Sequence, residues 1–263
     1  MARIIFDELL HYTPVDIVLR KDTIISEFRV KQIDEVVSRL LKDEPIQYIF
    51  GRTRFCGNEI AVSPAVLIPR PETEELVDFV VKENGGRADL RVVDLCTGSG
   101  CIAVSLARAL KFAEVTAVDI SDAALEVARK NVAALKVKVK VVKADVLHLP
   151  AEIEDARYDI IVSNPPYIAE SERSAMERNV LEYEPGLALF VPDDDPLKFY
   201  AAIGKLAAAS LSPGGRLYLE ANPLYVEELK SMLSSLGLRD VVSVADMTGR
   251  QRFVFAKSPS DDE

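Results

Sequence analysis

From residue 90 onward, short apolar runs alternate along the chain with segments in which apolar residues recur every three or four positions. The runs are typical of buried strands, and the longer spacing is typical of helices that bury one face. Strands are expected at residues 90–95, 114–119, 137–142, 158–163, 216–220, 240–245 and 252–257. Helices are expected at residues 100–110, 122–135, 196–211 and 223–236. This alternation predicts an α/β fold with a parallel sheet covered on both faces and ligands at the C-terminal ends of its strands.

The first 82 residues follow a different pattern. Residues 30–41 place their apolar side chains on one helical face, residues 52–62 suggest a short hairpin, and Pro71 is placed to open a further helix at residues 72–83. The expected organisation is a helical N-terminal domain at residues 1–50, a hairpin and connecting helix at 51–82, a main domain at 83–257 and a disordered polar tail at 258–263.

Residues 136–143, with the sequence KVKVKVVK, alternate lysine with valine. They can be read as a patch that binds nucleic acid, or as a strand at the edge of the sheet, where exposed lysines discourage pairing with another chain. The strict alternation favours the edge strand.

The composition narrows the class of protein. The chain has 263 residues, of which 49% are hydrophobic and 28% charged, and no stretch reaches the roughly 18 uninterrupted apolar residues of a membrane helix. Because the N-terminus also lacks a secretory signal, we expect a cytoplasmic, monomeric enzyme without a membrane partner. Three cysteines and two histidines give no pattern for a metal site, and a net charge of −10 argues against direct binding of nucleic acid through its phosphates.

The four residues Asn164, Pro165, Pro166 and Tyr167 directly follow an apolar run. An amide nitrogen is a poor nucleophile because its lone pair is delocalised, and two acceptors for its two N–H bonds would localise that pair. The Asn164 side-chain carbonyl and the Pro165 backbone carbonyl can supply these acceptors, and Tyr167 offers a flat face for a planar amide or base. The alternative is a proline loop that simply ends a strand.

A small-residue turn that contains Cys96, Thr97, Gly98, Ser99 and Gly100 separates the first strand of the main domain from its helix. The two glycines let the backbone pass close to a ligand, and the helix N-terminus favours an anionic group. The same spacing also fits a dinucleotide fingerprint.

Acidic residues end the next two strands. Asp119 can bind two ribose hydroxyls, which both NAD and S-adenosylmethionine (SAM) require. Asp145 can accept from an adenine amino group and Val146 can contact the ring, although a cap and core packing explain these two residues nearly as well. The Asn164–Tyr167 loop follows the strand expected beside the glycine turn, and this placement favours methyl transfer over hydride transfer, which has no use for a grip on an amine.

With these residues in place, the chain resembles the release-factor glutamine N5-methyltransferases, the PrmC or HemK family. The resemblance covers residues 44–257. It is carried by EPIQYIFG at 44–51, VLIPRPETE at 66–74, DLCTGSG at 94–100 and IVSNPPYI at 161–168. The second and fourth of these together are highly specific.

The resemblance implies a Rossmann-like seven-stranded SAM-dependent methyltransferase domain whose last strand is antiparallel, with a helical N-terminal domain and a hairpin linker. It implies that Cys96 to Gly100 and Asp119 contact SAM, that Val146 lies near adenine, and that Asn164 to Tyr167 hold the glutamine of the Gly-Gly-Gln loop of peptide chain release factors, with Asn164 also near the cofactor. Cys96 stands where the family often has glycine, so we expect its φ to be negative.

Two matters stay open at this point. The same grip would suit an exocyclic amine of DNA or RNA, although the acidic net charge and the lack of a basic stripe speak against this alternative. Arg70, Glu72 and Glu74 suit either a substrate entrance or the acidic start of a helix, and the sequence assigns no role to Glu184.

Overall fold

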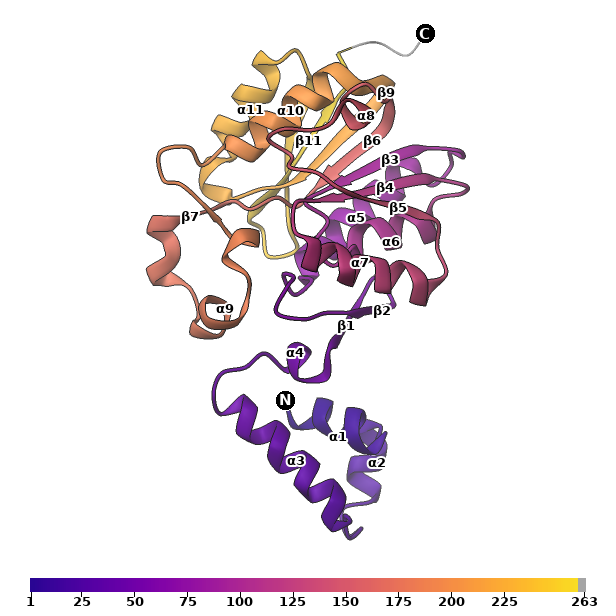
Figure 1. The fold of residues 1–263 in the computed structure, drawn as a ribbon, viewed down its shortest axis with the longest axis vertical. Helices are drawn as coiled ribbons and strands as arrows, with labels where there is room; N and C mark the ends of the chain where they lie inside the picture. The colour runs from indigo at the N-terminus through magenta and orange to yellow at the C-terminus, as the bar shows by residue number, and fades with distance from the viewer. Residues whose placement is uncertain (260–263) are drawn as a thin grey trace.

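The structure is a computed structural model and describes residues 1–259. Its main body is a seven-stranded sheet with the strand order β10-β11-β9-β6-β3-β4-β5 (Figure 1). The strands are β3 (Arg91–Leu95), β4 (Glu114–Asp119), β5 (Val139–Lys143), β6 (Tyr158–Ser163), β9 (Leu211–Glu220), β10 (Arg239–Ala245) and β11 (Gln251–Lys257). Neighbouring strands from β5 to β9 are parallel, and β11 pairs antiparallel with both β9 and β10. This is the Rossmann-like methyltransferase fold with its antiparallel last strand, as predicted.

Helices cover both faces of this sheet (Figure 1). One layer is formed by α5 (Pro71–Asn84), α6 (Cys101–Ala109) and α7 (Asp122–Leu135), and the other by α8 (Ala151–Glu154), α10 (Lys198–Ser210) and α11 (Val226–Ser235). Successive residues of a strand point to opposite faces, so Val92 belongs to the apolar cluster under the first layer and Val93 to the cluster under the second. Burial of β3 on both sides explains its continuous apolar sequence.

The N-terminal region forms a small helical unit below the sheet in the view of Figure 1. Its helices are α1 (Ala2–Leu10), α2 (Pro14–Leu19), α3 (Glu27–Leu40) and α4 (Ile46–Phe50), and Ile5, Val36 and Ile46 form its buried core. The helix predicted from residue 30 begins at Glu27, because the Ser26 side chain accepts a hydrogen bond from the Arg29 N–H and caps the helix. The predicted hairpin is confirmed as β1 (Arg52–Phe55) and β2 (Asn58–Ala61).

A long excursion between β6 and α10 was not predicted from the sequence. It contains the parallel pair β7 (Ile168–Ala169) and β8 (Phe190–Val191), the helix α9 (Arg178–Tyr183) and the 3-10 turns η1 (Glu170–Ala175) and η2 (Gly186–Ala188). These pieces are two to six residues long, which is too short for a hydrophobic period to be read.

Several boundaries differ from those predicted, each for a local reason. The lysine-rich segment is confirmed as an edge strand, β5, and Lys138, Lys140 and Lys143 are exposed. Strand β9 begins at Leu211, before an irregularity in its pairing with β6, and a Cβ at Gly215 would lie 2.8 Å from the Ser212 carbonyl oxygen.

Two further differences concern the C-terminal third of the chain. The helix predicted at residues 223–236 is divided into η3 (Pro223–Tyr225), capped by Asn222, and α11. Ser258 is buried and donates its N–H to the Gly215 carbonyl at 2.9 Å, so any tail begins after it; residues 260–263 of the predicted tail lie outside the described residues.

Among the side chains that fix the hairpin to the main body is the buried Asn131 of α7. Its Oδ1 accepts a hydrogen bond from the Ala61 N–H at 2.7 Å, and its Nδ2 donates to the Ala61 and Ser99 carbonyl oxygens at 3.0 and 2.8 Å. Asn131 therefore joins strand β2 to the glycine turn after β3.

Asn131→Leu keeps the size of this side chain and removes all three hydrogen bonds. Because the polar partners would be left without a substitute, we expect the free energy of unfolding to fall by about 3 kcal/mol in urea denaturation. The control Glu126→Gln changes an exposed residue of the same helix and should stay within about 0.5 kcal/mol of wild type. Equal stability of the two variants would show that Asn131 does not hold the hairpin in place.

Candidate functional site

A cavity of about 270 Å³ opens beside the C-terminal ends of β3, β4 and β6. Most of the side chains predicted to hold the cofactor line it, namely Cys96, Thr97, Gly98, Ser99, Asp119, Asp145, Val146 and Asn164, and so does Pro166. Gly100, Pro165 and Tyr167 are not part of its lining. The parallel pairing of β3 with β4 and β6, and of β4 with β5, thus brings residues from four separate sequence segments to one place.

The turn after β3 differs from the prediction at its first residue. Cys96 has a φ of 59°, in the left-handed region, where we expected a negative value because the residue is not glycine. Backbone hydrogen bonds hold this shape, since the Thr97 N–H donates to the Val118 carbonyl at 3.0 Å and the Gly100 N–H to the Thr97 carbonyl at 2.8 Å. The expectation was wrong because the fixed path of the turn outweighs the modest cost of a left-handed cysteine.

Gly100 contributes to packing rather than to the cavity wall. Its φ is 77°, and a Cβ at this position would lie 3.2 Å from the Ala128 Cβ on α7. A larger residue would push α6 away from α7 and move the start of the helix.

Asp119 connects the end of β4 to the glycine turn. Its Oδ2 accepts from the Gly98 N–H at 2.8 Å and its Oδ1 from the Ser121 N–H at 2.9 Å. Burial raises the pKa of this carboxyl, and the two backbone donors oppose the rise. The remaining lone pairs are available to hydroxyl donors of a ligand in the cavity.

For Asp145 and Val146 the sequence allowed either a contact with a ligand or a structural role as a cap and in core packing. The structure is compatible with both. Asp145 caps its own turn, since Oδ1 accepts from the Leu147 N–H at 2.9 Å, and it also lines the cavity. Val146 is buried in the apolar cluster under α10 and α11 and lines the same cavity. Neither residue is confined to one of the two roles.

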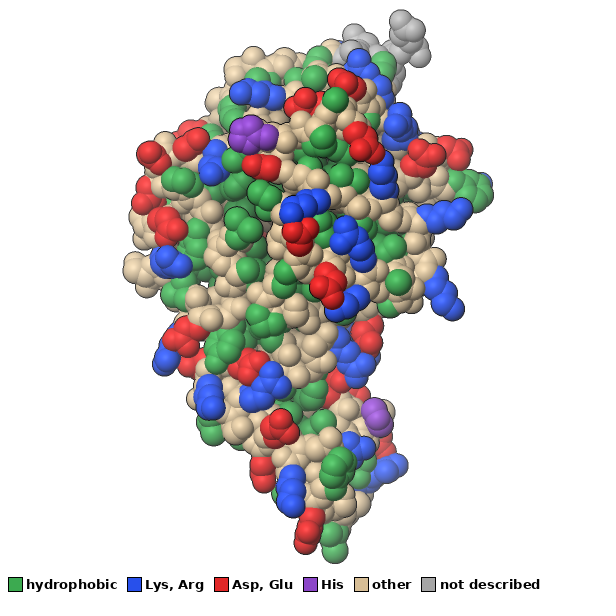
Figure 2. Space-filling model, in the orientation of Figure 1, with side chains coloured by type: hydrophobic (Ala, Val, Ile, Leu, Met, Phe, Trp, Pro, Cys, Tyr) green, Lys and Arg blue, Asp and Glu red, His purple; other side chains and the backbone are tan. Residues whose placement is uncertain are grey.

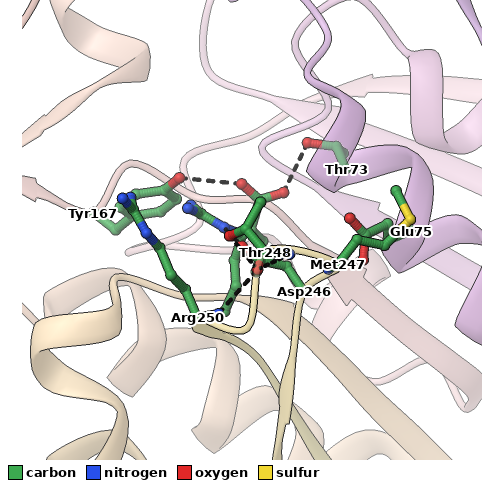
Figure 3. Close-up of polar contacts among 9 residues, drawn as sticks. Thr73, Glu75, Tyr167, Asp246, Met247, Thr248 and Arg250 are labelled. Carbon is green, nitrogen blue, oxygen red and sulfur yellow. Dashed lines mark hydrogen bonds and ion pairs between the residues drawn. The ribbon is translucent and has the colours of Figure 1, made fainter.

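The loop after β6 places its four residues differently. Asn164 faces the cavity, and its Nδ2 donates to the Thr73 hydroxyl at 3.1 Å. Tyr167 is not among the residues that line the cavity, and its hydroxyl donates to Glu220 at 3.1 Å (Figure 3). The flat face predicted to stack on an amide is therefore not part of the cavity wall.

Arg70 and Glu184 gain a structural role that the sequence did not reveal. Glu184 is buried, and it accepts from the Arg70 guanidinium at 2.5 Å and from the Ile68 N–H at 3.1 Å. This ion pair joins the segment before α5 to the segment after α9, and residues of both segments, Pro69 and Pro185 among them, line the cavity. Glu74 instead accepts from the Cys56 N–H of the hairpin at 3.0 Å.

One buried polar residue beside the turn, Asp94, was missed. Asp94 Oδ2 accepts from the Thr97 hydroxyl at 2.5 Å and from the Ala103 N–H at 3.1 Å. Within residues 1–259, Asp94 Oδ1 and the Ser99 hydroxyl have no hydrogen-bond partner. An acidic residue inside a strand that is otherwise apolar was the available signal for Asp94.

Cys96→Val tests the backbone shape of the turn. A β-branched side chain fits the left-handed region poorly, so we expect the free energy of unfolding to fall by about 2 kcal/mol, while Cys96→Gly should stay within about 1 kcal/mol of wild type. Chemical denaturation of both variants measures the difference. A valine variant as stable as the glycine variant would contradict the positive φ.

Asp94 gives a pH dependence with a defined sign. Burial raises its pKa to about 7 from 3.8, so the fold favours the protonated carboxyl, and the stability that this preference provides is lost as the pH rises from about 4 to about 7. Asp94→Asn keeps an acceptor and removes the ionisation. The free energy of unfolding of the variant relative to wild type should increase by roughly 2 kcal/mol between about pH 5 and about pH 7.5. Denaturation at both pH values measures it, and an unchanged difference would refute a raised pKa.

The N-terminal region and the main domain each match a known protein family. The family described as "PrmC N-terminal domain" matches residues 1–51, and the family described as "Methyltransferase small domain" matches residues 73–182. Solved structures share the fold. The catalytic domain of hMettl16 has a TM-score of 0.62 at 22% identity over 77% of this chain and 75% of its own. A 16S rRNA methyltransferase of T. thermophilus, RsmC, solved with AdoMet and guanosine, has a TM-score of 0.57 at 25% identity over 79% and 49%.

Related sequences are more specific than the fold. The release factor glutamine methyltransferase of Bacteroides thetaiotaomicron is 46% identical over 256 residues, which are 97% of this chain and 91% of the relative. That of Flavobacterium psychrophilum is 42% identical over 91% of this chain and 85% of the relative. A SAM-dependent methyltransferase fold, a cavity at the ends of β3, β4 and β6, and identities of this extent lead to one conclusion: the chain belongs to the release factor glutamine methyltransferase family.

Proposed function

We propose that this protein transfers a methyl group from SAM to the side-chain amide nitrogen of the glutamine in the Gly-Gly-Gln loop of peptide chain release factors. The observation that carries the proposal is that Asn164 lines the same cavity as Gly98 and Asp119. The side chain that we propose to hold the amide and the turn that we propose to bind the cofactor therefore face one space. The full-length relatives that bear this activity in their names add the substrate class.

The residues of the cavity fit SAM. The cofactor has a charged amino-acid end, a ribose with two hydroxyls and an adenine ring. The unpaired Ser99 hydroxyl and the start of α6 offer polar groups for the first, the Asp119 carboxylate for the second, and Val146 with Asp145 for the third. When bound, SAM supplies an electrophilic methyl group and leaves as S-adenosylhomocysteine.

The protein contributes to the reaction by orienting the substrate amide nitrogen. Asn164 Oδ1 accepts no hydrogen bond from residues 1–259, so it is available to an N–H of the substrate amide. We assign the second N–H to the Pro165 backbone carbonyl, with Pro166 stiffening the loop and Tyr167 supporting it from below. The methylated nitrogen releases its proton to water, and most of the rate enhancement comes from orientation in a preorganised polar site.

The remaining assignments concern the parts outside the cavity. We propose that residues 1–50 recognise the release factor, that residues 51–82 connect them to the methyltransferase domain at 83–257, and that the protein acts as a cytoplasmic monomer. No helix within residues 1–259 is long and apolar enough to cross a membrane. On the face shown in Figure 2, basic and acidic side chains are interspersed, without the continuous basic stripe of a protein that grips nucleic acid.

Asn164→Ala removes the acceptor for the substrate nitrogen and leaves the glycine turn intact. We expect kcat to fall by about 100-fold or more, with the Kd for SAM within about threefold of wild type, because the lost contact orients the nucleophile. Methylation is measured with radiolabelled SAM and binding by calorimetric titration. The surface variant Glu126→Gln serves as the control and should match wild type in both. Equal losses in activity and SAM binding would refute the division of roles.

The substrate is identified with the wild-type enzyme. Radiolabelled SAM is incubated with the enzyme and either a purified release factor or total nucleic acid, and mass spectrometry locates the label. A single added methyl on the glutamine of the Gly-Gly-Gln loop is the expected result. Label in the nucleic acid, with none in the protein, would replace the proposal with an exocyclic-amine methyltransferase.

A further inference from the structure

A buried carboxylate, Glu220, lies at the C-terminal end of β9 and contacts Tyr167 of the loop after β6. The side chain is almost completely inaccessible, at 1% exposure. Figure 3 shows the hydroxyls of Thr73 and Tyr167 approaching the two oxygens of one carboxylate, that of Glu220, at 2.7 and 3.1 Å. The proposed function uses neither Thr73 nor Glu220, although Thr73 lines the cavity.

Burial of Glu220 favours its protonated form, and the hydrogen-bond donors around it and Arg252 of β11 act in the opposite direction. Burial raises the pKa of Glu220, and the hydrogen bonds from Thr73 and Tyr167 together with the charge of Arg252 oppose that rise. Arg252 is itself held by Asp246, whose Oδ2 lies 2.8 Å from its Nε. The carboxylate thus has two hydroxyl donors, and when ionised it can only accept hydrogen bonds.

This arrangement determines the direction of the hydrogen bond between Thr73 and Asn164. A hydroxyl has a single proton, and Thr73 gives that proton to Glu220 Oε2. The Thr73 oxygen can then only accept from Asn164, so the group of Asn164 that faces it, at 3.1 Å, must be the NH2 group. A carbonyl oxygen in that place would meet the lone pairs of another oxygen. The two ends of the Asn164 amide are therefore not interchangeable.

We propose that Thr73 is a positioning residue for methyl transfer: with its proton committed to Glu220, its oxygen holds the NH2 group of Asn164 and thereby presents the Asn164 carbonyl oxygen to the substrate amide. The inference rests on the proposed role of Asn164 as an acceptor. Without this contact the side-chain amide could rotate by half a turn and present its NH2 group to the N–H bonds of the glutamine. That orientation would repel the substrate nitrogen rather than align it.

Thr73→Val tests the inference because it keeps the shape of the side chain and removes the hydroxyl, while Thr73→Ser restores the hydroxyl. We expect kcat of Thr73→Val to fall between roughly 10-fold and 100-fold, with the Kd for SAM within about threefold of wild type. Thr73→Ser should return kcat to within about threefold of wild type. The assays are release-factor methylation at saturating SAM, calorimetric titration with SAM, and thermal unfolding.

Thr248→Val is a matched control. The Thr248 hydroxyl also donates to a buried carboxylate, that of Asp246, at 2.6 Å (Figure 3), and within residues 1–259 no hydrogen bond joins it to Thr73 or Asn164. Its kcat should stay within about threefold of wild type. Thr73→Ala provides a second variant if valine prevents folding, because alanine is well tolerated in the first turn of a helix, and it should show the same loss of kcat.

The outcomes separate the inference from the proposed function. If the wild-type enzyme adds no methyl to the release-factor glutamine, the proposed function fails and the inference with it. If wild type is active and Thr73→Val and Thr73→Ala match it in kcat, only the inference is overturned. It is also overturned if Thr73→Ser fails to restore kcat, or if the variants lose SAM affinity and thermal stability in proportion to kcat, since that pattern belongs to a purely structural role.

Discussion

The parallel pairing of β3 with β6 is the constraint on which the site depends. It sets Leu95, just before the glycine turn, opposite Ser163, just before Asn164, and the Ser163 hydroxyl donates to the Leu95 carbonyl at 2.6 Å. Two segments almost 70 residues apart, at a sequence separation of 68, thereby end side by side. Because the carboxyl ends of parallel strands share one edge of the sheet, the glycine turn and the loop that begins at Asn164 meet at one cavity without any dedicated connecting element.

Much of this arrangement could be predicted from local patterns. Alternation of apolar runs with helical periods indicated the α/β fold, the lysines of β5 indicated an edge strand, and the order of the strands placed Asn164 beside Gly98. Each of these signals lies within a few residues of sequence. The residues of the glycine turn, Asp119 and Asn164 could be identified as candidates for the same reason, since each directly follows a strand and has a chemistry suited to a ligand.

The features that could not be predicted depend on contacts between distant segments. Thr73 and Glu220 are 147 residues apart, and nothing near either one marks it as a partner of the other. Arg70 and Glu184 form a similar long-range pair. The left-handed backbone of Cys96 was misjudged because a residue preference is only a tendency, which the path of the surrounding strands can override.

The hydroxyl of Tyr183 donates to the Lys42 carbonyl at 2.7 Å, and the Tyr48 hydroxyl donates to the Val66 carbonyl at 2.6 Å. The first contact ties the chain just after α3, and the second ties α4, to the two segments that Glu184 and Arg70 hold together. The rim of the cavity is therefore hydrogen-bonded to the helical N-terminal unit. If the release factor binds to those helices, as proposed, any shift of the helices on binding would also move the rim of the cavity through these hydrogen bonds.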